Sequence, residues 1–142
     1  MNKTPRISCA LLFIITLGAT VQAAADPKAY CSDKTLKGSY IFSIQGYQGA
    51  EPYPYASAGM FVFDGAGGIV DAVTRSTNRT TTRGTGTYSV GESCQGSMSL
   101  SSGNDYDIYV SPHGESFTFV RTSGNDVVAS RADRVSHKQI LK

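Results

Sequence analysis

From Gly38 onward, apolar and polar residues alternate in short runs, and each run ends at glycine, asparagine, aspartate, serine or proline. Alternation with a period of two residues is typical of antiparallel strands that bury one face and are joined by tight turns. Helical periodicity is nearly absent. The pattern predicts eight strands, at 39–45, 56–63, 69–76, 81–90, 96–101, 106–111, 116–122 and 127–132.

The predicted turns support these strands independently. The tetrapeptide Ser-Gly-Asn-Asp occurs at 102–105 and again at 123–126, each time between two apolar runs. Glycine and asparagine supply the positive φ that hairpin turns require. Gly84 and Gly86 lie near the start of the fourth predicted strand, where they indicate a bulge or a close backbone approach.

Sequential hairpins of similar length leave two exposed strand edges, and pairing the first strand with the last removes both. We therefore predict an all-β fold, a single antiparallel eight-stranded up-and-down barrel. A two-sheet β-sandwich of the same strands is the alternative, because periodicity does not determine whether the sheet closes. The barrel domain is expected at 26–132, followed by a polar tail at 133–142 that forms a helical turn or remains loose.

The first residues have the layout of a signal peptide. Lys3 and Arg6 form a cationic start, 10–21 is an apolar run, and small residues allow cleavage after Ala23 or Ala25. Cleavage after Ala25 is preferred, so 1–25 is the predicted signal peptide and the mature protein is predicted to be periplasmic or secreted. The apolar run is short for an uncleaved membrane anchor, and no membrane span is expected after cleavage.

Signal cleavage changes both the cysteine count and the net charge. Cys31 and Cys94 remain, and two cysteines that enter an oxidising compartment are expected to pair. The spacing is not C-x-x-C, which argues against a redox-active pair. Lys3 and Arg6 account for the whole excess of thirteen basic over eleven acidic residues. The mature domain is formally neutral, which argues against nucleic-acid binding as its main role.

No catalytic or metal-binding arrangement stands out in the sequence. His113 on a predicted turn and His137 in the tail are expected to be solvated surface residues, and neither is placed to support a catalytic triad. Zinc and calcium ligand patterns are lacking. We predict no metal, no cofactor and no enzymatic activity. A hydrolase or cyclase would need two acidic or phenolic groups in one cavity, with Asp71 and Tyr106 as candidates.

Two segments carry candidate binding residues. The segment 46–55 presents Tyr47, Tyr53 and Tyr55 on a loop stiffened by prolines, which offers amphipathic surface at low entropic cost. These tyrosines either cover a barrel mouth or plug one end of the core. Arg75 and Arg79 lie in a basic, hydroxyl-rich connection that either holds an anionic group or is a solvated loop.

The sequence also resembles two groups of proteins. The segments FDGAG at 63–67, GTYSV at 86–90 and CQG at 94–96 resemble uncharacterised exported bacterial proteins, which implies a secreted or periplasmic β-barrel without an established activity. Gly38-x-Tyr40 and Arg131 are similar to features of lipocalin and calycin barrels, whose first strand opens with Gly-x-Trp and whose late arginine packs across that ring. The second resemblance implies a ligand-binding barrel.

Together these features predict a non-enzymatic exported barrel that binds a small apolar molecule or a protein partner at the segment 46–55 and the adjacent barrel mouth. The alternative is a structural or surface-exposed, antigenic protein with a filled core and no ligand. The size of any internal cavity separates the two. A void below about 300 Å³ would count against the small-molecule hypothesis.

Overall fold

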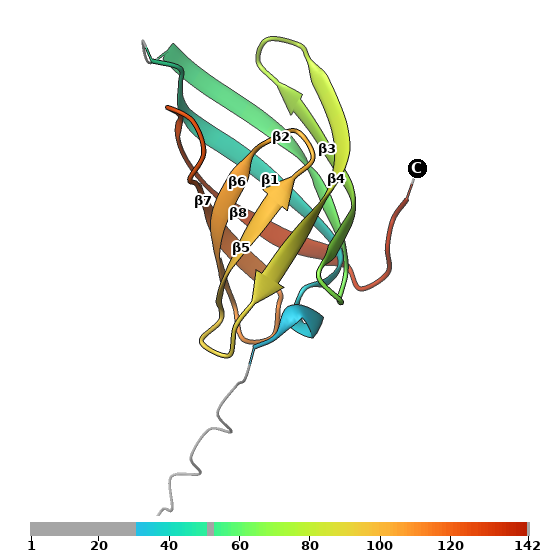
Figure 1. Ribbon diagram of the computed structural model, residues 1–142. Helices are drawn as coiled ribbons and strands as arrows, with labels where there is room; N and C mark the ends of the chain where they lie inside the picture. The colour runs from blue at the N-terminus through green and yellow to red at the C-terminus, as the bar shows by residue number, and fades with distance from the viewer. Residues whose placement is uncertain (1–30, 51–52, 142) are drawn as a thin grey trace, which may run out of the picture.

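The computed structural model describes residues 31–50 and 53–141, which form a closed antiparallel barrel (Figure 1). Each strand pairs with its neighbours in the chain, and β1 pairs with β8. The predicted up-and-down barrel is therefore confirmed over the sandwich. The strands are β1 (Lys37–Gln48), β2 (Tyr53–Asp64), β3 (Gly68–Ser76), β4 (Thr81–Val90), β5 (Gln95–Leu100), β6 (Asp105–Val110), β7 (Ser116–Arg121) and β8 (Val127–Ser136).

The predicted signal peptide at 1–25, with both candidate cleavage sites, lies outside the described residues. Within 31–50 and 53–141, no helix is long and apolar enough to span a membrane.

The ends of three strands differ from the sequence prediction. β1 continues to Gln48 and β2 begins at Tyr53, and these two residues are cross-strand partners. Most of the predicted 46–55 loop is therefore a strand hairpin. β8 continues to Ser136, four residues beyond the predicted boundary at 132. Pairing with neighbouring strands keeps these segments extended, although their own sequence is polar or contains proline.

The rest of the C-terminal tail crosses the outer face of β1. The Ser39 hydroxyl donates to the Lys138 carbonyl oxygen at 3.1 Å, and the Ile140 amide donates to the same hydroxyl oxygen at 2.8 Å. Ser39 and Val62 are cross-strand partners on the outer face, because their neighbours Tyr40 and Phe61 point into the core. Both are nevertheless fully buried. The tail is thus tethered against the barrel, contrary to the predicted helical turn or loose end.

A bulge in β3 lets residues of both parities face inward. Ile69 pairs with Gly86 and Ala72 with Gly84, so three steps on β3 match two on β4. Ile69 and Ala72 are both buried core residues. A Cβ on Gly86 would lie 2.3 Å from the Ser99 carbonyl oxygen, so this close approach requires glycine. The predicted bulge and close approach are both present, with the extra residue on β3.

Aromatic side chains fill the middle of the barrel. Phe42 and Phe61 stack with ring centroids 4.3 Å apart, and Phe61 also meets Phe63, Phe117 and Phe119 within 6.3 Å. All five rings belong to the buried core cluster. Alternation on each strand aims them at one another, which is how small eight-stranded barrels fill their interior.

One end of the barrel, called the closed end below, is covered by the 3₁₀ turn η1 (Asp33–Thr35) and the fully buried Leu36 (Figure 1). Cys31 and Cys94 form the predicted disulfide there, with their Cα atoms 4.9 Å apart. The bond joins the segment before η1 to the turn between β4 and β5. The Tyr88 hydroxyl, 2.8 Å from the carbonyl oxygens of Asp33 and Leu36, holds the same segment from inside.

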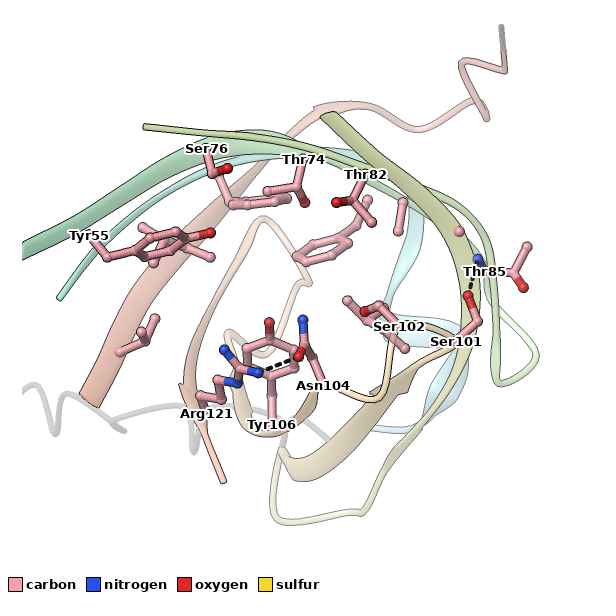
Figure 2. A pocket seen from close by; sticks show the side chains of 17 residues that line it. Tyr55, Thr74, Ser76, Thr82, Thr85, Ser101, Ser102, Asn104, Tyr106 and Arg121 are labelled. Carbon is pink, nitrogen blue, oxygen red and sulfur yellow. Dashed lines mark hydrogen bonds between the residues drawn. The ribbon is translucent and has the colours of Figure 1, made fainter. Parts of the chain in front are cut away.

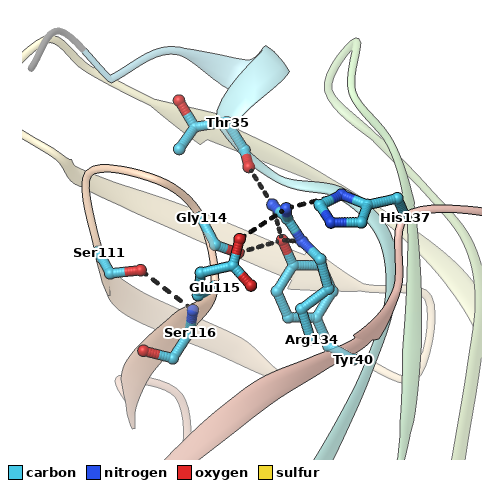
Figure 3. A network of polar contacts seen from close by, with 8 residues as sticks. All are labelled: Thr35, Tyr40, Ser111, Gly114, Glu115, Ser116, Arg134 and His137. Atoms are coloured by element: carbon cyan, nitrogen blue, oxygen red, sulfur yellow. Dashed lines mark hydrogen bonds and ion pairs between the residues drawn. The ribbon is translucent and has the colours of Figure 1, made fainter.

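Tyr40 at the closed end is covered by Arg134, where the resemblance to lipocalins implied Arg131. The Arg134 guanidinium carbon lies 5.3 Å from the Tyr40 ring centroid, and its Nε donates to the Tyr40 hydroxyl at 2.9 Å (Figure 3). Arg134 is the cross-strand partner of Tyr40, whereas Arg131 pairs with Ser43. The Arg131 side chain is 63% exposed and contacts Asp133. The prediction of Arg131 was wrong because its parity on β8 turns it outward.

Stability is expected to fall in alkaline solution because of Tyr88. Burial, the main cause, raises the pKa of Tyr88 from 10.0 to about 12. As the pH rises, Tyr88 loses its proton in the unfolded state before it does so in the folded state. The contribution of Tyr88 to the free energy of unfolding is therefore complete below pH 10.0 and declines as the pH rises toward about 12. Urea denaturation across this pH range measures the decline.

Tyr88→Phe is expected to make that alkaline decline shallower than in the wild type. Tyr109→Phe is the matched control, because Tyr109 is half exposed and should leave the slope unchanged. Equal slopes for the Tyr88→Phe and Tyr109→Phe proteins would show that Tyr88 is not responsible.

Candidate functional site

The end of the barrel opposite η1 contains a pocket of about 130 Å³ (Figure 2). Its floor is the apolar core, and its wall is polar. We call it the mouth pocket. The floor consists of Phe42, Ile44, Phe61, Ala72, Leu100 and Val128, with Gly84 beside it, and the polar wall consists of Tyr55, Thr74, Ser76, Thr82, Thr85, Ser101, Ser102, Asn104, Tyr106 and Arg121.

The polar wall continues the alternation that builds the core. On β3, Ala72, Thr74 and Ser76 are two residues apart and share the inward face. On β4, Thr82 and Gly84 repeat the same step. Toward the mouth, the inward positions therefore change from apolar side chains to hydroxyl-bearing ones without a break in the strands.

Arg121 contributes a guanidinium group to the wall that is already bound on both sides. One terminal nitrogen donates to a carboxylate oxygen of Asp126, and the other donates to the side-chain oxygen of Asn104 (Figure 2 draws the second bond). The other Asp126 oxygen accepts from the Gly49 amide at 3.0 Å. Asp126 therefore neutralises Arg121 and links the end of β1 to the turn before β8.

Two tyrosine hydroxyls face the pocket from opposite walls. Figure 2 shows the hydroxyls of Tyr55 and Tyr106 pointing into the space between the strands. Burial raises the pKa of Tyr106, against a smaller opposing effect of Arg121. The Tyr106 phenol consequently keeps its proton at neutral pH and can both donate and accept a hydrogen bond.

The structure places one of the predicted binding residues in this pocket. Tyr55 lines it, whereas Tyr47 and Tyr53 are 52% and 55% exposed on the hairpin outside it. The Tyr53 hydroxyl donates to the Gln48 side chain at 3.1 Å. The three tyrosines therefore neither cover the mouth together nor plug it. Pro52 of the same segment lies outside the described residues.

The predicted arginines lie outside the mouth pocket as well. Arg75 donates to the Thr81 hydroxyl at 3.1 Å on the surface of the β3–β4 hairpin. Arg79 occupies a turn position with a φ of 66°. Both are exposed, and neither is among the residues that line the mouth pocket.

The two candidate residues for hydrolase or cyclase chemistry do not meet. Tyr106 faces the mouth pocket, but Asp71 lies 3.3 Å from Arg83 in a separate surface depression that Leu141 also lines. Because acid–base chemistry needs both groups at the same reacting atoms, this pair cannot act together in the observed arrangement.

Several residues of the wall were missed by the sequence prediction. Asn104 belongs to a turn tetrapeptide, and Arg121 lies near the end of the strand predicted at 116–122, so neither carried a functional signal of its own. The available signal was the run of hydroxyl residues at alternate positions, Thr74, Ser76 and Thr82, on a face that is otherwise apolar.

No protein-family model, curated protein or solved structure matches the chain. The resemblance to exported bacterial proteins and to lipocalins stays a prediction, and inferences about function rest on the geometry of the barrel.

Proposed function

We propose that this protein is an exported, non-enzymatic barrel that binds a small, uncharged, hydrogen-bonding molecule in the mouth pocket. One observation carries the proposal: hydroxyl, phenol and amide groups from β2, β3, β4, β6 and the β5–β6 turn converge on a concave site with an apolar floor. A few polar groups placed around an apolar surface are typical of small-molecule sites. Within the described residues, Arg121 Nε is a buried polar atom of the wall without a hydrogen-bond partner, and a ligand acceptor would satisfy it.

The pocket size limits what the ligand can be. Its volume of about 130 Å³ is well below the range of roughly 300–1,000 Å³ of sites for drug-sized ligands. A cavity of about 150 Å³ holds a molecule as large as benzene. The ligand is therefore either a molecule of that size or one end group of a larger molecule that projects from the mouth. The polar wall favours a hydrogen-bonding molecule over the small apolar ligand expected from the sequence.

The charges around the pocket favour an uncharged ligand. Arg121 is the cationic residue of the wall, and Asp126 already binds it. The pair is largely buried, with 17% and 9% of the two side chains exposed. An anion would compete with Asp126 and leave a buried carboxylate without its partner, which costs several kcal/mol.

A second candidate is a structural or surface-interaction protein with a filled core and no ligand. The observation that favours it is the same small cavity above an aromatic core, since a void below about 300 Å³ counts against small-molecule binding. On this account, water occupies the mouth pocket and the outer loops make all contacts.

Native mass spectrometry of protein purified under non-denaturing conditions from exporting cells separates the two candidates. We expect a low-mass adduct on the wild-type protein. Replacing Thr74 and Thr82 with leucine should abolish this adduct. The larger side chains fill the pocket, and the substitution removes two hydroxyl groups. Thr118→Leu makes the same change on the exposed outer face of β7 and should leave the adduct intact. Absence of any adduct on the wild type, or its retention in the Thr74/Thr82 variant, would contradict the proposal.

A further inference from the structure

Both histidines of the chain, His113 and His137, lie at the closed end of the barrel. They line a shallow depression formed by η1, the start of β1, the β6–β7 turn and the end of β8. We call it the basic depression; its residues are Ser32, Lys34, Thr35, Lys37, Pro112, His113, Arg134 and His137. We propose that the basic depression binds a phosphate- or sulfate-type oxoanion, either free or as an ester on a larger molecule.

The charge of this surface is the first argument. Lys34, Lys37 and Arg134 carry three positive charges, and none of the residues that line the depression is acidic. Glu115 approaches Arg134 at 3.4 Å and offsets one of these charges. The lining residues and Glu115 together carry an excess of two positive charges, which favours an anion.

Two other carboxylates at the closed end of the barrel, those of Asp33 and Asp64, accept hydrogen bonds from backbone amides. Asp33 in η1 accepts the Val90 amide at 2.7 Å, and Asp64 accepts the amides of Ala66 and Gly68 at 2.7 and 2.9 Å. These hydrogen bonds fix both carboxylates in their turns. The two lysines are exposed and free to reach an anion in the depression.

Arg134 adds a fixed positive charge to the depression, and its nitrogens are already hydrogen-bonded within the protein. Its side chain is only 7% exposed, and it donates to the Thr35 carbonyl oxygen at 2.9 Å as well as to the Tyr40 hydroxyl (Figure 3). Its Nη1 lies 3.0 Å from Nδ1 of His137. Arginine can only donate, so Nδ1 accepts and the ring proton is on Nε2. The contact with Arg134 therefore orients the His137 ring. The Nε2–H group of that ring is a further donor, which Arg134 does not bind.

The test is titration of the full-length mature protein with sodium sulfate at constant ionic strength, followed by NMR of backbone amides and histidine rings. We expect saturable shifts around the basic depression. Replacing Lys34 and Lys37 with glutamine should weaken the affinity about tenfold or more.

Replacing Arg75 and Arg79 with glutamine is the matched control. It removes the same charge as the lysine variant, but from the β3–β4 hairpin at the other end of the barrel. The control should change sulfate affinity by less than about twofold. An equal loss in the control and the lysine variant, or no saturation by sulfate, would each overturn the proposal.

A second titration, with a heparin-derived oligosaccharide, separates the two sources of the oxoanion. If the oligosaccharide binds much more tightly than free sulfate, and the lysine variant loses affinity for both, the ligand is a sulfate ester on a larger molecule. Equal or weaker binding identifies the free ion. The basic depression and the mouth pocket lie at opposite ends of the barrel, so either proposal can fail without the other.

Discussion

Replacing Cys31 and Cys94 together with serine is expected to lower the free energy of unfolding by about 4 kcal/mol. The disulfide joins residues 63 positions apart, and closing a loop of that length removes much of the conformational entropy of the unfolded chain. The loss is a large share of the stability of a small domain. Urea denaturation of the oxidised wild type and the double serine variant measures it.

The wild-type protein in reducing buffer is the natural control for this prediction. Reduction breaks the same bond without changing any residue, so it should reproduce most of the loss. A double serine variant that unfolds within about 1 kcal/mol of the oxidised wild type would show that the closed end is stable without the cross-link.

Phe61→Ala is expected to destabilise the protein by about 3–5 kcal/mol. The Phe61 ring is 1% exposed, stacks on Phe42 and contacts three further aromatic rings. Truncation removes these contacts and leaves a cavity that the rigid barrel cannot close. Because Phe61 also lies on the floor of the mouth pocket, the variant should enlarge the pocket as well.

Two variants calibrate the effect of Phe61→Ala in the same denaturation experiment. Phe61→Leu preserves part of the volume and should lose less stability. Val120→Ala truncates an outward, 43% exposed residue of β7 and should change stability by less than about 0.5 kcal/mol. A similar loss for Phe61→Ala and Val120→Ala would contradict the assignment of Phe61 to the core.

The strands were predictable because a half-buried strand shows its inward face directly in the sequence. Tyr106, Ile108 and Val110 alternate with exposed residues on β6, as the pattern predicted. The pattern failed where local sequence and pairing disagree. Gly46 and Pro54 suggest a loop, but they lie in the β1–β2 ladder, and the bulge in β3 places Ile69 and Ala72 on one face despite their spacing.

The functional surfaces were less predictable because they depend on strand register. Tyr55 was identified from its loop composition, but its partner across the mouth pocket, Tyr106, comes from a strand far along the chain. His113 and His137 each looked like isolated surface residues. Closure of the barrel brings the end of β8 beside the start of β1 and places both histidines on the basic depression.

The two ends of the barrel differ because their inward residues differ. At the closed end, Leu36 and the rings of Tyr40 and Tyr88 complete an apolar core under η1. At the mouth, threonine and serine occupy the equivalent positions and leave space between them. Ligand binding is therefore expected where the core ends and the polar wall begins.

The most direct test of binding at the mouth pocket is an NMR titration of the labelled protein with small uncharged probes, namely glycerol, myo-inositol and acetamide. We predict saturable shifts for at least one probe, confined to amides around Thr74, Thr82 and Asn104 and abolished when Thr74 and Thr82 are replaced by leucine. Shifts scattered over the whole surface, or unchanged in the leucine variant, would contradict a binding site in the mouth pocket.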